Sequence, residues 1–151
     1  MSMVLKMYNK FEKFPMGKKL FSMLICFKAP YFGSVKPYFA ELKNGRCVIT
    51  MKKRRAVQNH IKSVHAIAMC NISELAAGTM LEASIPATMR WIPKKMSVDY
   101  LKVAKTDLKA ICELGEVDWQ SQDLPLTVNV TDTNDVLVFQ AVITMYISPK
   151  R

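Results

Sequence analysis

The chain has 151 residues, half of them hydrophobic, and a net charge of +10 at pH 7. A chain of this length and composition folds into one domain with a sizeable core, which excludes a disordered protein. The charge favours a phosphate-bearing or other polyanionic partner, an acidic membrane surface, or solubility alone, and does not separate these. The apolar run at residues 20–27 is far shorter than the roughly 20 residues of a membrane span, and no small-residue cleavage site follows it. We therefore expect a cytoplasmic protein.

The first predicted elements are two amphipathic helices. Apolar residues recur with helical spacing over residues 3–14 and again over residues 20–27, with lysines elsewhere on the first helical wheel. Pro15 suits the first turn of the second helix, and Pro30 ends the pattern. We expect both helices to pack over the domain. The alternative is a basic helical hairpin that lies on a membrane surface.

A β-hairpin and a long buried helix follow. Asn44-Gly45, the strongest two-residue turn signal, separates residues 37–43 from residues 46–53. Between residues 64 and 81 the only charged side chain is Glu74, so this segment predicts a helix buried on nearly every side. Ser63 is a candidate N-cap, and the helix is expected to end near Leu81. A lone carboxylate in such a helix is costly unless it is paired or used.

The rest of the chain predicts strands. Alternation marks residues 108–114, 126–130 and 137–147, and residues 90–104 form a further candidate in which Pro93 indicates an edge position or a break. Asn134-Asp135 marks the turn before the last strand. No internal repeat or linker is present. The simplest packing is an α+β architecture in which an antiparallel sheet wraps around the central helix, giving a single domain over residues 1–151.

Cysteine and histidine usage argues against a metal centre. The four cysteines form no CxxC pair and lie among apolar residues, which is typical of small buried side chains in a reducing compartment. They are Cys26, Cys47, Cys70 and Cys112. His60 and His65 are the only histidines, so a tetrahedral zinc site would lack ligands and no metal is expected.

The element order and the central helix resemble the hotdog fold. Asn59 lies six residues before His65, and Glu74 lies nine residues after it. This spacing is similar to that of the phenylacetate-pathway type of hotdog acyl-CoA thioesterase, in which an Asn precedes a His-Gly-Gly and an Asp follows. Here Ala66 and Ile67 replace the glycines, and Glu replaces Asp. The likeness covers a hotdog core at residues 38–151. The helical extension at residues 1–30 resembles that of a hotdog branch catalogued only as a domain of unknown function.

The resemblance implies thioester hydrolysis. Glu74 is the candidate general base or nucleophile, because a carboxylate partly removed from water is a stronger base. The Ala66 N–H at the helix start would polarise the thioester carbonyl, Asn59 would hold the water or the carbonyl, and His65 would orient the loop or the carbonyl. The alternatives are a structural histidine and a structural acid bonded to Asn71 or to a partner chain. Coenzyme A enters only as part of the substrate, and no other cofactor is implied.

Helix geometry predicts a homodimer, and it leaves open the pairing of such dimers into a tetramer. Nine residues at about 100° each place His65 and Glu74 on opposite sides of an ideal helix. One chain therefore does not easily bring both to one substrate. Two chains with adjacent central helices do, with the Asn59/His65 end from one subunit and Glu74 from the other, as the resemblance also implies.

Basic clusters are candidates for contact with the phosphates of coenzyme A, although a charge cluster is more often a solvated face. The best candidates are Arg54, Arg55, Arg90, Lys94 and Lys95. No glycine-rich phosphate loop and no GxSxG motif is present.

Three other functions remain open. The first is a non-catalytic acyl-CoA-binding hotdog protein, favoured by the missing glycines. The second is nucleic-acid or membrane-surface binding driven by charge, although the aromatic–basic interleaving of single-strand binders is absent. The third is a hotdog dehydratase or isomerase. The leading prediction is an acyl-CoA thioesterase with no nucleic-acid partner and no stable membrane insertion.

Overall fold

The computed structural model describes residues 1–150. Two helices, α1 (Met3–Phe11) and α2 (Gly17–Lys28), precede the 3-10 helix η1 (Pro30–Val35) and a hairpin of β1 (Tyr38–Lys43) and β2 (Arg46–Met51). The 3-10 turn η2 (Arg55–Val57) leads into the long helix α3 (Ala66–Ser84). Four strands follow: β3 (Met89–Tyr100), β4 (Leu108–Glu113), β5 (Gln122–Thr131) and β6 (Leu137–Pro149). Within these residues, no helix is long and apolar enough to cross a membrane.

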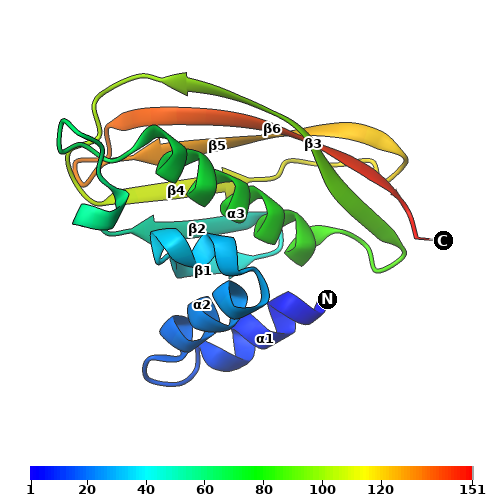
Figure 1. The fold of residues 1–151 in the computed structure, drawn as a ribbon. Helices are drawn as coiled ribbons and strands as arrows, with labels where there is room; N and C mark the ends of the chain where they lie inside the picture. Colours follow the sequence, from blue (N-terminus) through cyan, green and yellow to red (C-terminus); the bar gives the residue numbers. More distant parts are fainter. Residues whose placement is uncertain (151) are drawn as a thin grey trace.

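The six strands form one sheet in the order β1-β2-β4-β5-β6-β3, and every neighbouring pair is antiparallel. Helix α3 lies along one face of this sheet, as the sequence predicts (Figure 1). The connection from β2 through α3 to β3 carries the chain from one side of the sheet to its far edge. The first two helices lie beside β1, at the opposite edge (Figure 1).

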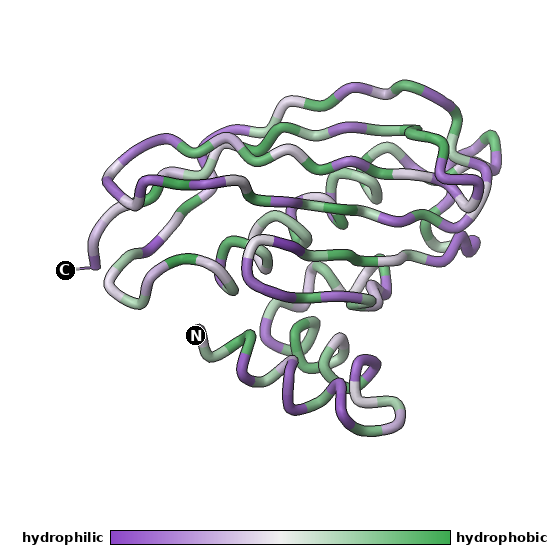
Figure 2. The backbone as a smooth tube through the Cα atoms, turned by 180° about the vertical axis from the view of Figure 1, so that it is seen from behind, coloured by the Kyte–Doolittle hydropathy of each residue, from purple (hydrophilic) through white to green (hydrophobic). Residues whose placement is uncertain are grey.

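Hydrophobic and hydrophilic residues alternate along the strands, as the green and purple segments of the tube in Figure 2 show. This alternation gives the sheet one apolar face. The side chains that face α3 from β4 and β5 are buried, and those between them are half-buried or exposed. In β6, Phe139, Ala141, Ile143, Met145 and Ile147 are each at most 1% exposed. Burying one large aliphatic side chain contributes about 1.5–3 kcal/mol, so this face supplies much of the stability.

Helix α3 is buried along most of its length, but its ends differ from the prediction. His65 caps the helix, because its Nδ1 accepts from the Ile67 N–H at 3.1 Å. The prediction that Ser63 is the cap is wrong. The Ser63 hydroxyl instead accepts a hydrogen bond from the side-chain amide of Asn59. The helix also continues three residues past Leu81, to Ser84. The Ser84 hydroxyl accepts from the Gly45 N–H at 2.8 Å and so ties the helix end to the β1–β2 turn.

The second helix begins two residues later than the sequence predicts. Pro15 lies in the turn before the helix, and Met16 adopts a left-handed conformation with φ of 61°. Gly17 then opens α2. A Cβ on Gly17 would lie 1.7 Å from the carbonyl oxygen of Phe11, so only glycine allows the two helices to approach this closely.

Strand β3 lies at the edge of the sheet, as Pro93 indicates. It pairs only with β6, and the register shifts between Pro93 and Lys95. Proline lacks a backbone N–H, so both the edge position and the irregularity follow from the sequence. Along its other side, β3 has no strand partner among residues 1–150.

Candidate functional site

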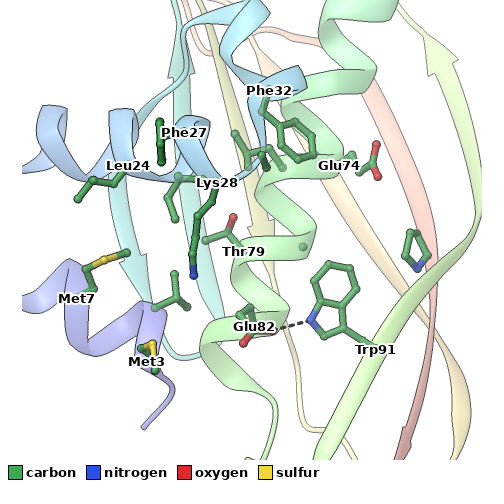
Figure 3. A pocket seen from close by; sticks show the side chains of 16 residues that line it. Met3, Met7, Leu24, Phe27, Lys28, Phe32, Glu74, Thr79, Glu82 and Trp91 are labelled. Carbon is green, nitrogen blue, oxygen red and sulfur yellow. Dashed lines mark hydrogen bonds between the residues drawn. The ribbon is translucent and has the colours of Figure 1, made fainter.

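A cavity of about 710 Å³ lies between the N-terminal helices and the central helix. One wall comes from α1, α2 and η1, and the other comes from α3 and the start of β3 (Figure 3). The first wall is apolar and includes Met3, Met7, Leu24, Phe27 and Phe32. The second wall includes Glu74, Gly78, Thr79, Glu82 and Trp91. Ligand cavities of this size and apolar character accept a small organic molecule or an aliphatic chain.

Glu74 lies at this cavity and is half-buried. Among residues 1–150 its carboxylate has no hydrogen-bond or ion-pair partner. The alternative that Asn71 binds it does not hold, because the Asn71 amide donates to the Ser34 hydroxyl at 3.4 Å and to the Tyr31 carbonyl at 3.5 Å. A carboxylate beside an apolar cavity, with none of its oxygens occupied, is placed to act on a ligand.

The start of α3 offers one unoccupied hydrogen-bond donor. The N–H of Ile67 donates to the His65 ring, and those of Ala68 and Met69 donate to the His65 carbonyl. The Ala66 N–H is the member of this first turn that has no partner within residues 1–150. An N–H at a helix N-terminus carries partial positive charge, so it suits an anion or a polarised carbonyl.

His65 and Asn59 have structural contacts here. The His65 cap requires a neutral ring with its proton on Nε2, because Nδ1 acts as the acceptor. The Asn59 Oδ1 accepts from the N–H groups of Ile61 and Ser63, both at 3.1 Å, and its Nδ2 donates to the Ser63 hydroxyl at 2.8 Å. Asn59 therefore holds together the loop that delivers the start of α3. Direct contact of either side chain with a substrate stays a prediction.

A second, smaller pocket of about 170 Å³ lies at the start of α3. It is lined by His65, Gln58 and Asn71, among others. The Asn71 Oδ1 is buried without a hydrogen-bond partner within the described chain, which is costly unless a ligand or water supplies one. Gln58 and Asn71 were not predicted as site residues. An amide within an otherwise apolar helix was the signal available for Asn71.

The two pockets share no lining residue. Glu74 lines the large cavity, and His65 lines the small one. Along α3 the two residues are separated by about 13 Å, from a rise of about 1.5 Å per residue. The placement of the two residues at different pockets agrees with the expectation that one chain does not bring both to a single substrate, and a site shared between two chains stays a prediction.

The candidate phosphate-binding residues fall into two groups. Arg54 and Arg55 lie where β2 gives way to η2, next to residues that line the small pocket, and the Arg54 guanidinium donates to the Ser34 carbonyl. Arg90, Lys94 and Lys95 lie on β3. Lys94 pairs with Asp123 at 2.7 Å, which offsets its charge. The structure therefore does not bring the five residues together within one chain.

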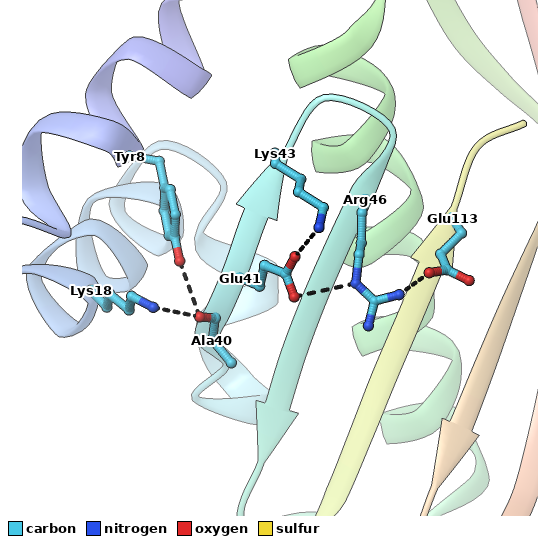
Figure 4. A network of polar contacts seen from close by, with 7 residues as sticks. All are labelled: Tyr8, Lys18, Ala40, Glu41, Lys43, Arg46 and Glu113. Atoms are coloured by element: carbon cyan, nitrogen blue, oxygen red, sulfur yellow. Dashed lines mark hydrogen bonds and ion pairs between the residues drawn. The ribbon is translucent and has the colours of Figure 1, made fainter. Parts of the chain in front are cut away.

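The apolar wall is anchored to the sheet through a bulge in β1 (Figure 4). The register shifts between Phe39 and Glu41, so the Ala40 carbonyl lies outside the β1–β2 ladder. It accepts from the Tyr8 hydroxyl of α1 at 3.1 Å and from the Lys18 ammonium of α2 at 2.7 Å. The neighbouring Phe39 N–H donates to the Ser22 hydroxyl of α2 at 3.0 Å. These bonds satisfy outward-facing backbone groups of an edge strand and hold both helices in place.

The cysteines are not candidate nucleophiles. All four are free thiols. Burial raises the pKa of Cys112 to about 12 and holds the pKa of Cys47 well above its usual range. Burial also raises the pKa of Cys26 and Cys70. Thiols in this state are protonated at neutral pH and unreactive. Within residues 1–150, no group of three or more His, Cys, Asp or Glu residues is placed to hold a metal ion.

The fold is shared with several solved structures. A structural-genomics crystal structure is 44% identical, with 97% of this chain and 99% of that chain covered and a TM-score of 0.87. A protein of unknown function from Pseudomonas aeruginosa, described as a probable thioesterase, is 19% identical over 91% of this chain and 97% of that chain, with a TM-score of 0.78. A thioesterase from Staphylococcus aureus, solved as a mutant, is 17% identical over 80% and 99%, with a TM-score of 0.71.

These comparisons define the class of protein. The chain has the hotdog fold, as its sequence indicates. Residues 17–147 match the family described as "Domain of unknown function (DUF4442)", and the chain belongs to that family. No curated protein matches the sequence.

Proposed function

We propose that this protein is an acyl-CoA thioesterase that acts as a homodimer. The main support is the unpaired carboxylate of Glu74 beside a cavity of about 710 Å³ with an apolar wall. The unoccupied Ala66 N–H at the start of the same helix supplies the second group that the reaction needs. The names of solved hotdog relatives point in the same direction.

The chemistry follows from these two groups. Glu74 takes a proton from water, whose oxygen attacks the carbonyl carbon of the thioester. The negative charge that develops on the carbonyl oxygen is stabilised by the Ala66 N–H of the other subunit, and such a donor is worth roughly a hundredfold or more in rate. The tetrahedral intermediate collapses as the C–S bond breaks, and Glu74 returns its proton to the departing thiolate. Direct attack by the carboxylate, followed by hydrolysis of the resulting anhydride, uses the same placement.

A dimer around a two-fold axis would complete the site. Suppose that two α3 helices pack antiparallel with Ala66 of one opposite Glu74 of the other. The numbers of any two residues that face each other then add up to 140, so residue 70 faces its own copy and the two-fold axis passes beside Cys70. Cys70 is half-buried, and Ile67, on the same face of the helix, is 54% exposed. The unpaired edge of β3 and its exposed Ile92 and Tyr100 support the same face as the interface.

The cavity supports an acyl chain as one part of the substrate. Its apolar wall suits the acyl chain. The thioester would lie at Glu74, and the chain would extend towards Met3 and Met7, which lie across the cavity from Glu74 in Figure 3. The diphosphate of coenzyme A would remain outside, where Arg54, Arg55, Arg90 and Lys95 offer positive charge. Lys94 is the weakest of these candidates because of its pairing with Asp123.

Hydrolysis of a panel of acyl-CoA esters, followed with a thiol reagent, tests the proposal. The substitution Glu74→Gln should lower kcat by about 10² to 10⁴ while the protein remains folded. Glu116→Gln, which changes an exposed acid that does not line the cavity, is the matched control and should retain activity. Equal loss in both variants, or full activity in Glu74→Gln, contradicts the role given to Glu74.

The second candidate is a non-catalytic acyl-CoA-binding protein. Ala66 and Ile67 replace the two glycines of the related thioesterases, and the exposed Ile67 side chain narrows access to the helix start. Saturable binding of acyl-CoA without release of free thiol would favour this candidate over the enzyme.

A further inference from the structure

The helical hairpin of α1 and α2 has an outer face that is exposed and apolar. Within residues 1–150, nine of the 17 exposed large hydrophobic side chains belong to residues 1–36. Phe27 is 86% exposed, and Met3 is 81% exposed. Monomeric proteins rarely expose contiguous apolar surface of this kind without a partner for it.

The spacing on α2 shows that this surface is continuous. Exposed apolar residues recur four, seven, eight and eleven positions after Met16, which places them on one face of the helix. They are Met16, Leu20, Met23, Leu24 and Phe27. The opposite face contains Phe21 and Ser22, which are buried against β1. Helix α2 therefore has two apolar sides. One side packs against the sheet, and the other side is exposed.

The charge around this face is strongly positive. Residues 1–36 contain seven lysines and a single acid, Glu12. No ion pair joins any of these lysines to an acid within residues 1–150. Lys13 and Lys19 are exposed close to the apolar residues. Apolar side chains bordered by unpaired lysines are the pattern of helices that lie in the plane of an anionic lipid surface.

We propose that the outer face of the α1–α2 hairpin docks on an anionic lipid bilayer, with α2 parallel to the membrane plane. A second copy of this chain is a poorer occupant, because self-association would bring together two hairpins that are both strongly positive. An anionic bilayer neutralises the exposed lysines that border this face, such as Lys13 and Lys19, and buries the apolar residues between them. Docking requires no membrane-spanning segment, since the helices enter only the headgroup region.

The docked face adjoins the large cavity. Met3, Leu24, Phe27 and Lys28 belong to the hairpin surface and also line the cavity (Figure 3). On a bilayer this part of the cavity would face the lipid. The docking itself does not depend on the activity proposed above, because it requires neither the Glu74 carboxylate nor hydrolysis of a substrate.

Sedimentation of the full chain with sucrose-loaded vesicles tests the inference. We expect binding to vesicles of phosphatidylcholine with 30% phosphatidylglycerol, weak binding to pure phosphatidylcholine, and a decline with added salt. Phe27→Ser should weaken the partition coefficient about tenfold, since a large apolar side chain no longer enters the interface. Lys13→Gln with Lys19→Gln should weaken it by at least about fivefold, the contribution expected from one lysine near an anionic surface.

Matched control variants distinguish binding through this face from non-specific binding to vesicles. Val103→Ser removes an apolar side chain that is 57% exposed on another loop, and Lys102→Gln with Lys105→Gln removes two exposed charges there. Both controls should bind vesicles as the unchanged protein does.

Absence of binding to anionic vesicles overturns the inference. Binding that follows the lysines but ignores Phe27→Ser also overturns it and indicates a general polyanion surface. A loss of self-association in Phe27→Ser, measured by sedimentation velocity, would assign the face to a second copy instead.

Discussion

The indole ring of Trp91 packs against α3 where Gly78 has no side chain. A Cβ at position 78 would lie 3.0 Å from Cη2 of Trp91, closer than carbon atoms normally approach. The indole N–H also donates to the Glu82 carboxylate at 2.9 Å, so Trp91 is bound to two successive turns of α3. This contact joins the edge strand β3 to the central helix and forms part of the cavity wall.

Gly78→Ala should displace Trp91 and reshape the cavity. Alanine raises helix propensity by about 0.8–1 kcal/mol, whereas overpacking costs about 1–3 kcal/mol, so we expect a small net destabilisation. Fluorescence in a Trp119→Phe background reports Trp91 alone, and its emission should shift. Gly115→Ala, where a Cβ meets no atom within 4 Å, is the control. An unchanged Trp91 spectrum would show that the ring does not depend on this close approach.

Cys70 should cross-link two copies of the protein. The proposed two-fold axis passes beside it, while Cys47 and Cys112 are fully buried and Cys26 lies on α2. A short bis-maleimide or a mild oxidant at alkaline pH, which offsets the raised pKa of Cys70, should give a covalent dimer on a denaturing gel. Cys70→Ala should abolish the dimer and Cys26→Ala should not. The reverse pattern would place the interface elsewhere.

His65→Ala should remove the N-cap of α3 and lower the free energy of unfolding by about 0.5–2 kcal/mol. His65→Asn should recover most of this loss, because an asparagine side chain also accepts from the N–H groups of the first turn. Thermal unfolding of both variants measures the effect. The same pair separates two roles for His65. Activity that recovers with stability in the Asn variant indicates a structural histidine, and activity that stays low indicates contact with the substrate.

Alkaline pH should destabilise the protein partly through Cys112. Burial raises its pKa from 9.0 to about 12 in the folded chain. The unfolded chain therefore loses this proton at lower pH than the folded chain does. The contribution of this thiol to the free energy of unfolding is fully present below pH 9 and is lost as the pH rises towards 12. Between pH 9 and 11, urea unfolding of Cys112→Ala should show a shallower decline in stability than the unchanged protein. Equal slopes would mean that this thiol is accessible to water when folded.

Periodicity predicted the elements whose structure depends on local pattern. The apolar segment around Glu74 forms the buried helix, Asn44-Gly45 forms the hairpin turn, and alternation located the later strands. These signals are strong because burial against a sheet demands a period of two in strands and a nearly uniform apolar surface in a central helix. The hotdog fold was recognised by resemblance, through the order of these elements and the spacing of Asn59, His65 and Glu74, and the solved structures confirm it.

The details that the sequence did not predict depend on contacts between distant segments. His65 displaces Ser63 as the cap because Asn59, in the preceding loop, occupies the serine hydroxyl. The start of α2 is set by how closely Gly17 approaches Phe11. The pairing of Trp91 with Gly78 joins residues of two different elements, and neither residue is distinctive alone. Likewise, the basic residues divide between two regions because their positions depend on the path of the chain and not on local sequence.

The bulge at Ala40 has a consequence for assembly. Sheets with two bare margins can stack edge to edge without end, which is the geometry of fibrils. Here Tyr8, Lys18 and Ser22 occupy the Ala40 carbonyl and the Phe39 N–H at the β1 margin, so the β3 margin is the better placed of the two to recruit another strand. When two such margins meet, growth stops at a pair. The N-terminal helices therefore oppose strand pairing at β1, and this limits edge-to-edge assembly of the sheet to two chains.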